Sequence, residues 1–268
     1  MNAYDIEIAQ LRKVFVQKTT QSEIVAINAL DLKITQGEIV AIVGSTGCGK
    51  STLFDLIIGL DSPTSGTLLI GGKSPHADFD AFKGRIATVF QQDRLLPWRT
   101  ALDNVCLPLE LLGMPLREQH ERAIKWLDRL GLAEFKNAYP RELSGGMRQR
   151  VAISRAFALQ SGLLLADESF SALDAVTARE LRELFVSLAR ESGSTAILIT
   201  HQLEEAVAVG QRIIVFGKSA KLLGDVQMSA WQSSQYGTLY DALRKTIQLG
   251  EPFADIVAQG DLEVAPGA

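Results

Sequence analysis

A glycine-rich segment between an apolar run and a helical pattern constrains this chain more than any other feature. The run Glu38–Val43, apolar from its second residue on, is typical of a strand covered on both faces of a parallel sheet. The next segment, Gly44-Ser45-Thr46-Gly47-Cys48-Gly49-Lys50-Ser51, fits the pattern G-x-x-x-x-G-K-[ST]. Helical spacing then runs over residues 50–60. The order strand, glycine-rich turn, helix predicts an α/β fold with a phosphate-binding loop.

Each part of this loop has a role in holding phosphate. Glycines let successive backbone N–H groups converge on one anion, and the start of a helix adds the positive end of its dipole. The Lys50 ammonium supplies a charge for the β- and γ-phosphates, and the Ser51 hydroxyl can coordinate Mg²⁺. We therefore expect the loop to bind a nucleoside triphosphate.

Strand-like and helical segments alternate along the rest of the chain, which predicts a mainly parallel sheet. Strand candidates occupy residues 6–11, 27–34, 162–166, 196–200 and 212–216. Helical patterns cover residues 93–159, with an amphipathic helix at 117–130, and residues 175–191. The stretch 93–159 is therefore expected to be a helical insertion into the sheet. A tail with a candidate helix at 239–249 follows residue 218.

Composition and charge argue against nucleic acid as a partner and against a membrane-spanning segment. The chain has 27 Lys and Arg against 31 Asp and Glu, a net charge of −4, so it has no general basic field to hold nucleic acid. Its longest apolar runs, such as Ile39–Val43, are far shorter than the ~18 residues needed to span a bilayer. No secretory signal is visible at the start, and two cysteines form no disulfide framework. We expect a soluble protein that does not itself cross a membrane.

Two further strand ends carry candidate catalytic groups. The apolar run 163–166 ends in Asp167 and Glu168, of which the first can act near Mg²⁺ and the second can polarise a water. The run 196–200 is followed by His201, at the edge where open α/β sheets bind ligands, so its imidazole can contact a γ-phosphate. The other two histidines, His76 and His120, are expected to be structural.

A helix start at Ser144 allows two interpretations. Ser144-Gly145-Gly146 precedes a helical pattern, the serine suits an N-cap, and the two glycines leave backbone N–H groups accessible. The segment is either a second anion site without a lysine of its own or an ordinary capped helix.

In this order and spacing, the motifs make the sequence resemble the nucleotide-binding subunits of ABC transporters over residues 5–217. Residues 44–52, ending at Thr52, resemble Walker A, Leu163–Glu168 resembles Walker B, and Leu143–Gln149 resembles the signature motif. Gln91, after the strand candidate 86–90, matches the Q-loop. Ser171-Ala172-Leu173-Asp174 resembles the D-loop, and His201 the switch histidine. Phe15 stands where the family has an aromatic that stacks on adenine; packing within a strand is the alternative.

The resemblance implies a P-loop NTPase fold of the RecA type. Its core is an α/β unit with a mainly parallel sheet, to which an antiparallel β subdomain and an inserted helical subdomain are added. Residues 1–217 would form the nucleotide-binding domain, with the helical subdomain at about 93–159, and residues 218–268 a helical tail packed on the core. Two subunits, expected to form a homodimer, would meet head to tail, so that Ser144, Gly145 and Gly146 bind the ATP held by the partner's loop.

The cofactors implied are ATP and Mg²⁺. By resemblance, ATP is held by Phe15, Gly44-Ser45-Thr46-Gly47-Cys48-Gly49-Lys50-Ser51-Thr52 and the signature, and the metal by Ser51, Gln91 and Asp167. The catalytic residues implied are Lys50, which stabilises charge, Glu168, which polarises the water, His201, which holds the γ-phosphate, and Gln91. Gln91 would pass the nucleotide state to a membrane partner.

Three positions depart from the usual family pattern. Ser169 stands where proline usually follows the glutamate, Ala166 replaces a larger aliphatic residue, and Gln202 replaces a frequent aspartate. None of these changes removes a catalytic group, so they bear on turnover rate rather than on competence.

One stretch resembles a subgroup, the ATPases of nitrate, taurine and alkanesulfonate uptake, together with those for thiamine precursors. It is Arg94-Leu95-Leu96-Pro97-Trp98, followed by Asn104-Val105. In this family the region after the Q-loop receives the permease, and an exposed Leu-Leu-Pro-Trp suits a partner surface. The alternative is that Trp98 only packs in the helical subdomain.

The expected function is ATP hydrolysis that drives an importer. The partners would be membrane permease subunits and, indirectly, a solute-binding protein, with no nucleic acid, at the cytoplasmic face of the cell (inner) membrane. An ATPase of an export or lipoprotein-release system, or a soluble ABC ATPase acting on DNA or ribosomes, are the alternatives. The transported solute leaves no trace in this sequence, because the ATPase never touches it.

Overall fold

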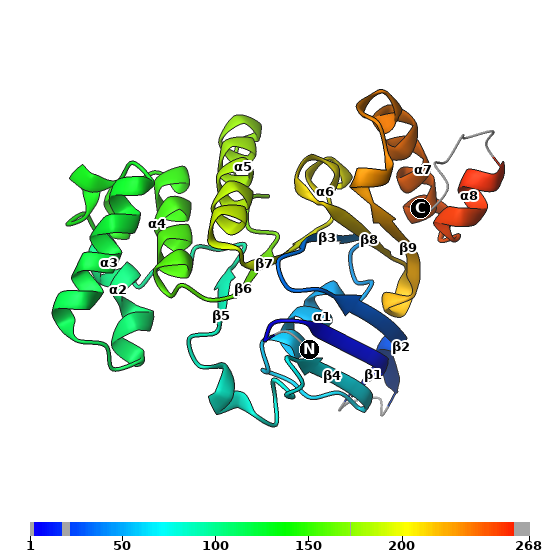
Figure 1. Ribbon diagram of the computed structural model, residues 1–268, viewed down its shortest axis with the longest axis horizontal. Coiled ribbons are helices and arrows are strands. Elements are labelled where there is room, and N and C mark those ends of the chain that lie inside the picture. The colour runs from blue at the N-terminus through cyan, green and yellow to red at the C-terminus, as the bar shows by residue number, and fades with distance from the viewer. Residues whose placement is uncertain (1–2, 18–21, 172, 260–268) are drawn as a thin grey trace. The chain divides into compact units, whose positions relative to one another are not determined.

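In the computed structural model the described residues are 3–17, 22–171 and 173–259. They belong to two compact units (Figure 1). The first unit comprises residues 1–79 and 197–268, and the second comprises residues 80–196.

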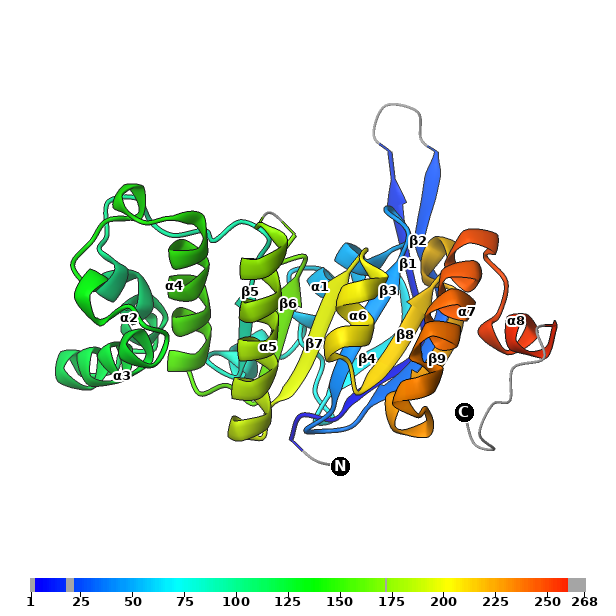
Figure 2. The ribbon, with the colours of Figure 1, turned by 90° about the horizontal axis from the view of Figure 1, so that it is seen from above.

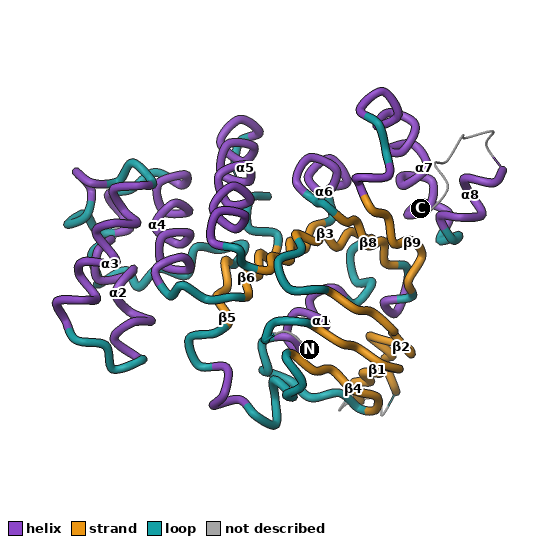
Figure 3. The backbone as a smooth tube through the Cα atoms, viewed as in Figure 1, coloured by secondary structure: helices purple, strands orange, loops and turns teal. Residues whose placement is uncertain are grey.

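Three antiparallel strands form one sheet of the first unit, in the order β2-β1-β4 (Figure 3). They are β1 (Ile6–Val16), β2 (Glu23–Ile34) and β4 (Ser65–Ile70). Ile6 faces Ile34 on one side and Ile70 on the other, and all three side chains are buried. Strands β1 and β2 are longer than the predicted pieces 6–11 and 27–34, because register shifts between Leu11 and Lys13 interrupt the regular alternation.

The other strands of the first unit follow one another in the order β7-β3-β8-β9. Their bounds are Thr195–Thr200 for β7, Ile39–Gly44 for β3, Arg212–Phe216 for β8 and Leu222–Gln227 for β9. Strand β8 runs parallel to β3 and antiparallel to β9. Every residue of β3 and β7 is buried, as their continuous apolar runs predicted. Strand β9 was not predicted, since a glycine and an aspartate interrupt its apolar residues.

Two short helices follow β3 and β7. Helix α1 spans Lys50–Ile57, three residues shorter than the predicted helix, and α6 spans Leu203–Val209. The end of α1 is explained by Gly59, whose φ is 79°. A Cβ at this position would lie 2.5 Å from the carbonyl oxygen of Pro75, so the left-handed turn is available to glycine alone.

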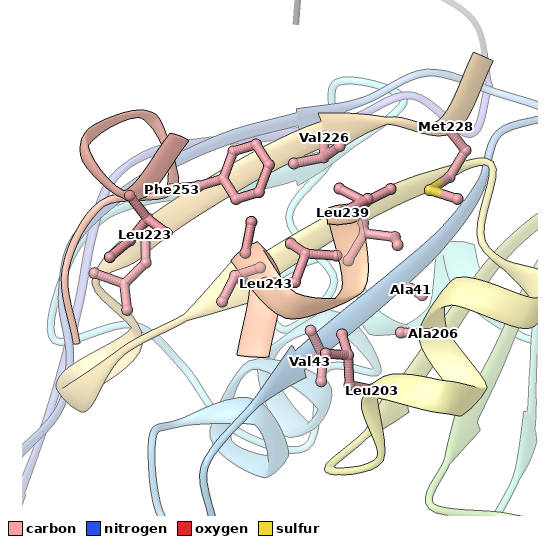
Figure 4. Close-up of a cluster of buried hydrophobic side chains, with 14 of the residues drawn as sticks. Ala41, Val43, Leu203, Ala206, Leu223, Val226, Met228, Leu239, Leu243 and Phe253 are labelled. Carbon is pink, nitrogen blue, oxygen red and sulfur yellow. The ribbon is translucent and has the colours of Figure 1, made fainter. Parts of the chain in front are cut away.

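The tail of the first unit carries α7 (Tyr236–Leu249) and α8 (Phe253–Gln259). Apolar side chains of both helices pack with those of β8, β9 and α6 in one buried cluster. Figure 4 shows Leu239 and Leu243 of α7 beside Val226 of β9, with Phe253 over the same sheet face. Helix α8 was not predicted from the sequence.

The second unit pairs a two-stranded parallel ladder with four helices. Strand β5 (Ile86–Val89) runs parallel to β6 (Leu163–Asp167). The helices are α2 (Ala101–Leu111), α3 (Leu116–Arg129), α4 (Gly145–Ala158) and α5 (Ala175–Ser192). Figure 2 shows α2, α3 and α4 side by side, and each contacts the other two. Phe157 of α4 lies between Trp126 and Phe185, with ring centroids 5.2 and 5.7 Å away.

The predicted fold class is confirmed at this level. Parallel ladders join β3 to β8 and β5 to β6, and a separate antiparallel sheet contains β1, β2 and β4. Three helices, α2, α3 and α4, occupy the stretch 93–159. None of the helices in the described part of the chain is both long and apolar enough to cross a membrane.

Candidate nucleotide site

The phosphate loop, residues 44–51, lies in the first unit between β3 and α1. Its backbone is left-handed at Gly47, with φ 78°, and at Gly49, with φ 114°. A Cβ at Gly49 would lie 2.5 Å from the carbonyl oxygen of Ala26, and one at Gly44 would lie 2.5 Å from that of Phe216. Two neighbouring segments therefore press on the loop so closely that only glycine fits at its start and end.

Lys50 is folded back over this loop. Its side chain is buried, and Nζ donates to the carbonyl oxygens of Gly44, at 2.7 Å, and Ser45, at 3.0 Å. Ser45, Thr46 and Gly47 are exposed at the crest of the same loop. An ammonium ion held by carbonyls beside an exposed curl of backbone fits the requirements of a triphosphate, because the lysine can exchange these carbonyls for phosphate oxygens.

A segment that sequence reasoning missed supports the loop from beneath. The backbone N–H of Ala220 donates to the carbonyl oxygen of Cys48 at 2.6 Å, and Ser219 Oγ donates to that of Val25 at 2.8 Å. Ser219 and Ala220 have φ of 55° and 52°, an uncommon conformation for residues other than glycine. No glycine or proline marks these two positions, so no local signal in the sequence would have found them.

His201 follows β7, the strand next to β3, and its side chain is exposed. The residues on either side are held firmly. Thr200 Oγ1 donates to Glu205 Oε2 at 2.5 Å and accepts from the Gln202 N–H at 3.0 Å. Glu205 is buried in α6. The hydrogen bonds fix the turn around His201, and Glu205 is a further residue of this region that the sequence did not reveal.

Phe15 lies near the end of β1 in the same unit, and 42% of it is exposed. The Lys13 ammonium lies 4.9 Å from its ring centroid and also donates to Asp61 at 2.6 Å. Burial raises the pKa of the Asp61 carboxyl, but the hydrogen bonds from Lys13 and the Ser62 N–H, together with the charge of Lys13, outweigh it and hold that pKa below its usual value. The Phe15 ring is thus contacted by Lys13 but remains exposed, whereas a side chain in the core of a strand would be buried.

The acidic turn, residues 167–171, follows β6 in the second unit. Glu168 is half-buried and has a φ of 45°. Ser171 donates to its carbonyl oxygen through both the backbone N–H, at 3.2 Å, and Oγ, at 2.9 Å. Gln91 Nε2 in turn donates to Ser171 Oγ at 3.3 Å. The structure therefore brings Gln91 onto the turn that carries Asp167 and Glu168; Ala172, the next residue, lies outside the described residues.

Ser144 caps α4, accepting from the Met147 N–H at 3.2 Å, as the plainer of its two interpretations requires. The helix start also borders a cavity of about 590 Å³ within the second unit. Its lining includes Ser144, Gly145, Gly146, Phe135, Asp174 and Thr177. The capped helix end therefore opens onto a space large enough for part of a ligand.

The Leu-Leu-Pro-Trp stretch after Gln91, which was expected to be exposed, is exposed only at its last two residues. Leu95 is buried and Leu96 is half-buried, whereas Pro97 and Trp98 are exposed. Asn104, which is fully buried, bonds to the backbone of this stretch: its side chain accepts from the Leu96 N–H and donates to the carbonyls of residues 96, 99 and 100. These bonds hold the backbone of residues 96, 99 and 100 against the first turn of α2.

Trp98 is 71% exposed, so packing within the helical subdomain does not account for it. Its neighbour Arg99 forms an ion pair with Glu110 of α2 at 2.6 Å. Leu111 follows on that helix and is also exposed, as is Leu116 at the start of α3. Trp98, Leu111 and Leu116 are thus exposed apolar side chains of the second unit.

The site residues expected from the sequence form two sets. Phe15, the phosphate loop and His201 belong to the first unit, and Gln91, the acidic turn and the Ser144 helix start belong to the second. Within each set the residues stand on ends of strands or starts of helices. Such positions are where backbone N–H groups and side chains remain available for ligands.

Comparison with known proteins assigns a family to this arrangement of motifs. A family model described as "ABC transporter" matches residues 27–171. A nitrate import ATP-binding protein of Synechocystis sp. is 43% identical over 213 residues, which are 78% of this chain and 77% of that protein. An aliphatic sulfonates import ATP-binding protein of Pseudomonas putida is 44% identical over 205 residues, 76% of this chain and 70% of that protein.

A solved structure extends the similarity to the fold. It is the dimeric structure of an ATP-binding cassette in a post-hydrolysis state, bound to ADP and Pi. It is 35% identical, covers 83% of this chain and 98% of its own, and superimposes with a TM-score of 0.73. The P-loop NTPase fold expected from the motifs is thereby confirmed.

Proposed function

The chain belongs to the ABC transporter family and is an ATPase of that family, and from this premise we propose that it drives an importer. In this proposal two copies meet head to tail, bind ATP between them, and couple hydrolysis to the uptake of a small solute through separate membrane subunits. The observation that supports it most is the phosphate loop, whose glycines and folded-back Lys50 are built for a triphosphate.

We assign the chemistry to the residues that the motifs single out. Residues 44–52 and Phe15 bind the nucleotide, and the Lys50 ammonium offsets charge on the β- and γ-phosphates. The Glu168 carboxylate polarises the attacking water, and His201 holds the γ-phosphate in register. Mg²⁺ bound with the nucleotide supplies further charge neutralisation, with Ser51, Gln91 and Asp167 as its proposed ligands.

The head-to-tail pair rests on the helix start at Ser144. Gly145 and Gly146 leave N–H groups at a capped helix end beside a cavity of about 590 Å³, and that end has no lysine of its own. A phosphate delivered by a second copy would complete this site, since helix starts favour anions. The related cassette structure is dimeric, which supports a dimer here.

The permease is the proposed partner of the exposed side chains of Trp98, Leu111 and Leu116. Exposed aromatic and aliphatic side chains of this kind suit a protein interface. Relatives named for the import of nitrate and aliphatic sulfonates support an importer. We propose a position at the cytoplasmic face of the cell membrane, an indirect link to a solute-binding protein, and a solute of the nitrate, sulfonate, taurine or thiamine-precursor kind.

The importer proposal is tested by identifying the proteins that co-purify with this chain in the presence of ATP. Tagged Glu168→Gln chain, purified with ATP from detergent-solubilised membranes of its own cells, is expected to bring along a permease and a second copy of itself. The matched control Glu183→Gln changes an exposed glutamate that is paired with Arg179 on α5, and it should recover less because it completes hydrolysis. Recovery of ribosomal proteins, a DNA-repair factor or an efflux protein would contradict the importer.

A further inference from the structure

Ser169, the residue after the proposed catalytic glutamate, joins three segments of the second unit. Its side chain is buried, and Oγ donates to the carbonyl oxygen of Val89 at 2.5 Å, with that of Asp167 as a longer second acceptor at 3.3 Å. Its own carbonyl oxygen accepts from Gln149 Nε2 at 2.7 Å. Val89 ends β5 two residues before Gln91, Asp167 ends β6, and Gln149 lies in α4.

The backbone next to Ser169 has an uncommon conformation. Glu168 has a φ of 45°, in the left-handed region that residues other than glycine rarely occupy. Such conformations persist only where the surrounding contacts hold them. Here Ser171 holds the Glu168 carbonyl from one side, and the Ser169 hydroxyl anchors the next residue to β5. A proline at position 169 would push Glu168 towards extended conformations and would carry no hydroxyl.

We propose that Ser169 is a positioning residue for hydrolysis, whose hydroxyl locks the acidic turn to the end of β5. The bond from Ser169 Oγ to the Val89 carbonyl oxygen joins the turn that carries Glu168 to the end of β5, which leads to Gln91. Glu168 and Gln91 are therefore held in fixed positions relative to each other. The inference rests on the proposed function of Glu168. Its effect is expected on the hydrolytic step rather than on ATP affinity, because the bonds of Ser169 hold the backbone on either side of Glu168 and none of them reaches the phosphate loop.

The test compares the full-length chain with Ser169→Ala, Ser169→Thr and a matched control, Ser154→Ala. Ser154 is also buried, and its hydroxyl donates to the carbonyl oxygen of Arg150 within α4. Steady-state MgATP hydrolysis gives kcat and KM, and titration with a fluorescent ATP analogue counts binding sites. Loss of the hydroxyl in Ser169→Ala is expected to lower kcat about fivefold to tenfold with KM changed by less than about twofold.

Threonine keeps the hydroxyl, so Ser169→Thr should restore most of kcat, and Ser154→Ala should match the wild type. Hydrogen exchange provides a second readout that needs no turnover: amides of residues 86–91 and 168–171 should exchange faster in Ser169→Ala only. Unchanged kcat and exchange in Ser169→Ala, or an equal loss in Ser154→Ala, would overturn the inference while leaving the ATPase intact. A wild-type chain that binds no MgATP and does not hydrolyse it would instead remove the proposed function, and the inference with it.

Discussion

The phosphate loop and the acidic turn solve the same geometrical problem in different ways. Each follows a buried strand, β3 or β6, and each turns through the left-handed region of backbone space. In the phosphate loop that conformation is taken by Gly47 and Gly49. In the acidic turn it is taken by Glu168, a residue that prefers to avoid it.

The difference lies in what holds each turn in place. The phosphate loop is held by backbone groups of neighbouring segments, which approach so closely that glycine is required. The acidic turn is held by the hydroxyls of Ser169 and Ser171, which bond to backbone carbonyl oxygens. Turns that depend on glycine can therefore be predicted from a sequence, whereas turns held by side chains can be recognised only once the bonding partners of those side chains are known.

Gly49→Ala is the largest expected break in this comparison. At φ 114° its new Cβ would lie 2.5 Å from the Ala26 carbonyl oxygen, so strain and steric clash add. We expect a loss of about 3 kcal/mol or more of unfolding free energy and no measurable ATP affinity. Urea denaturation and ATP titration measure both quantities.

Gly47→Ala is the matched control for this prediction. Its φ is 78°, but a Cβ there meets nothing within 4 Å, so only the backbone strain of about 1 kcal/mol remains. Equal losses in the two variants would show that close approach has no part in the phosphate loop.

In the acidic turn, Ser171→Ala removes the hydroxyl that donates to the Glu168 carbonyl and accepts from Gln91. We expect kcat to fall about fivefold, as for one lost hydrogen bond. In the Ser171→Ala background, the further change Gln91→Ala should lower kcat by a smaller factor than it does in the wild type, because the two residues act through one bond. Ser192→Ala, which removes the hydroxyl of an exposed serine at the end of α5, is the control and should leave kcat unchanged. Strictly additive effects would separate Gln91 from the turn.

Glu168→Gly and Glu168→Ala both remove the carboxylate, but only glycine relieves the left-handed backbone. The glycine variant is therefore expected to be about 1 kcal/mol more stable than the alanine variant. Thermal or urea unfolding gives the comparison directly. If the alanine variant proves as stable as the glycine variant, Glu168 carries no backbone strain.

Cys48→Ala should have the smallest effect. The thiol is buried in the phosphate loop, and Lys50 Nζ lies 3.8 Å from its sulfur, but the loop is held by backbone bonds. We expect the ATP KM to stay within about twofold and unfolding free energy to fall by less than about 1 kcal/mol. A tenfold rise in KM would mean that a side chain shapes this loop as well.

The features that could be predicted from the sequence are those that depend on residues close together along the chain. The strand Arg212–Phe216 and the helix over residues 175–191 follow from local apolar patterns, and the structure has them within a residue. The phosphate loop carries its requirement in its own glycines. What remained hidden depends on partners far along the chain, such as the bond from Ser169 to Val89, 80 residues away, or the support of Cys48 by Ala220. The burial of Asn104 was missed for another reason: the sequence gives no sign that a polar residue in a helix is buried.

Hydrolysis by Glu168→Gln tests the central claim most directly. The purified full-length wild type, Glu168→Gln and the exposed control Glu183→Gln are compared in MgATP turnover and in binding of a fluorescent ATP analogue. A polarising carboxylate contributes about a hundredfold or more, so turnover by Glu168→Gln should fall at least that far while binding is kept. Glu183→Gln should match the wild type in both. Turnover by Glu168→Gln at the wild-type rate would contradict the assignment of the acidic turn as the hydrolytic centre.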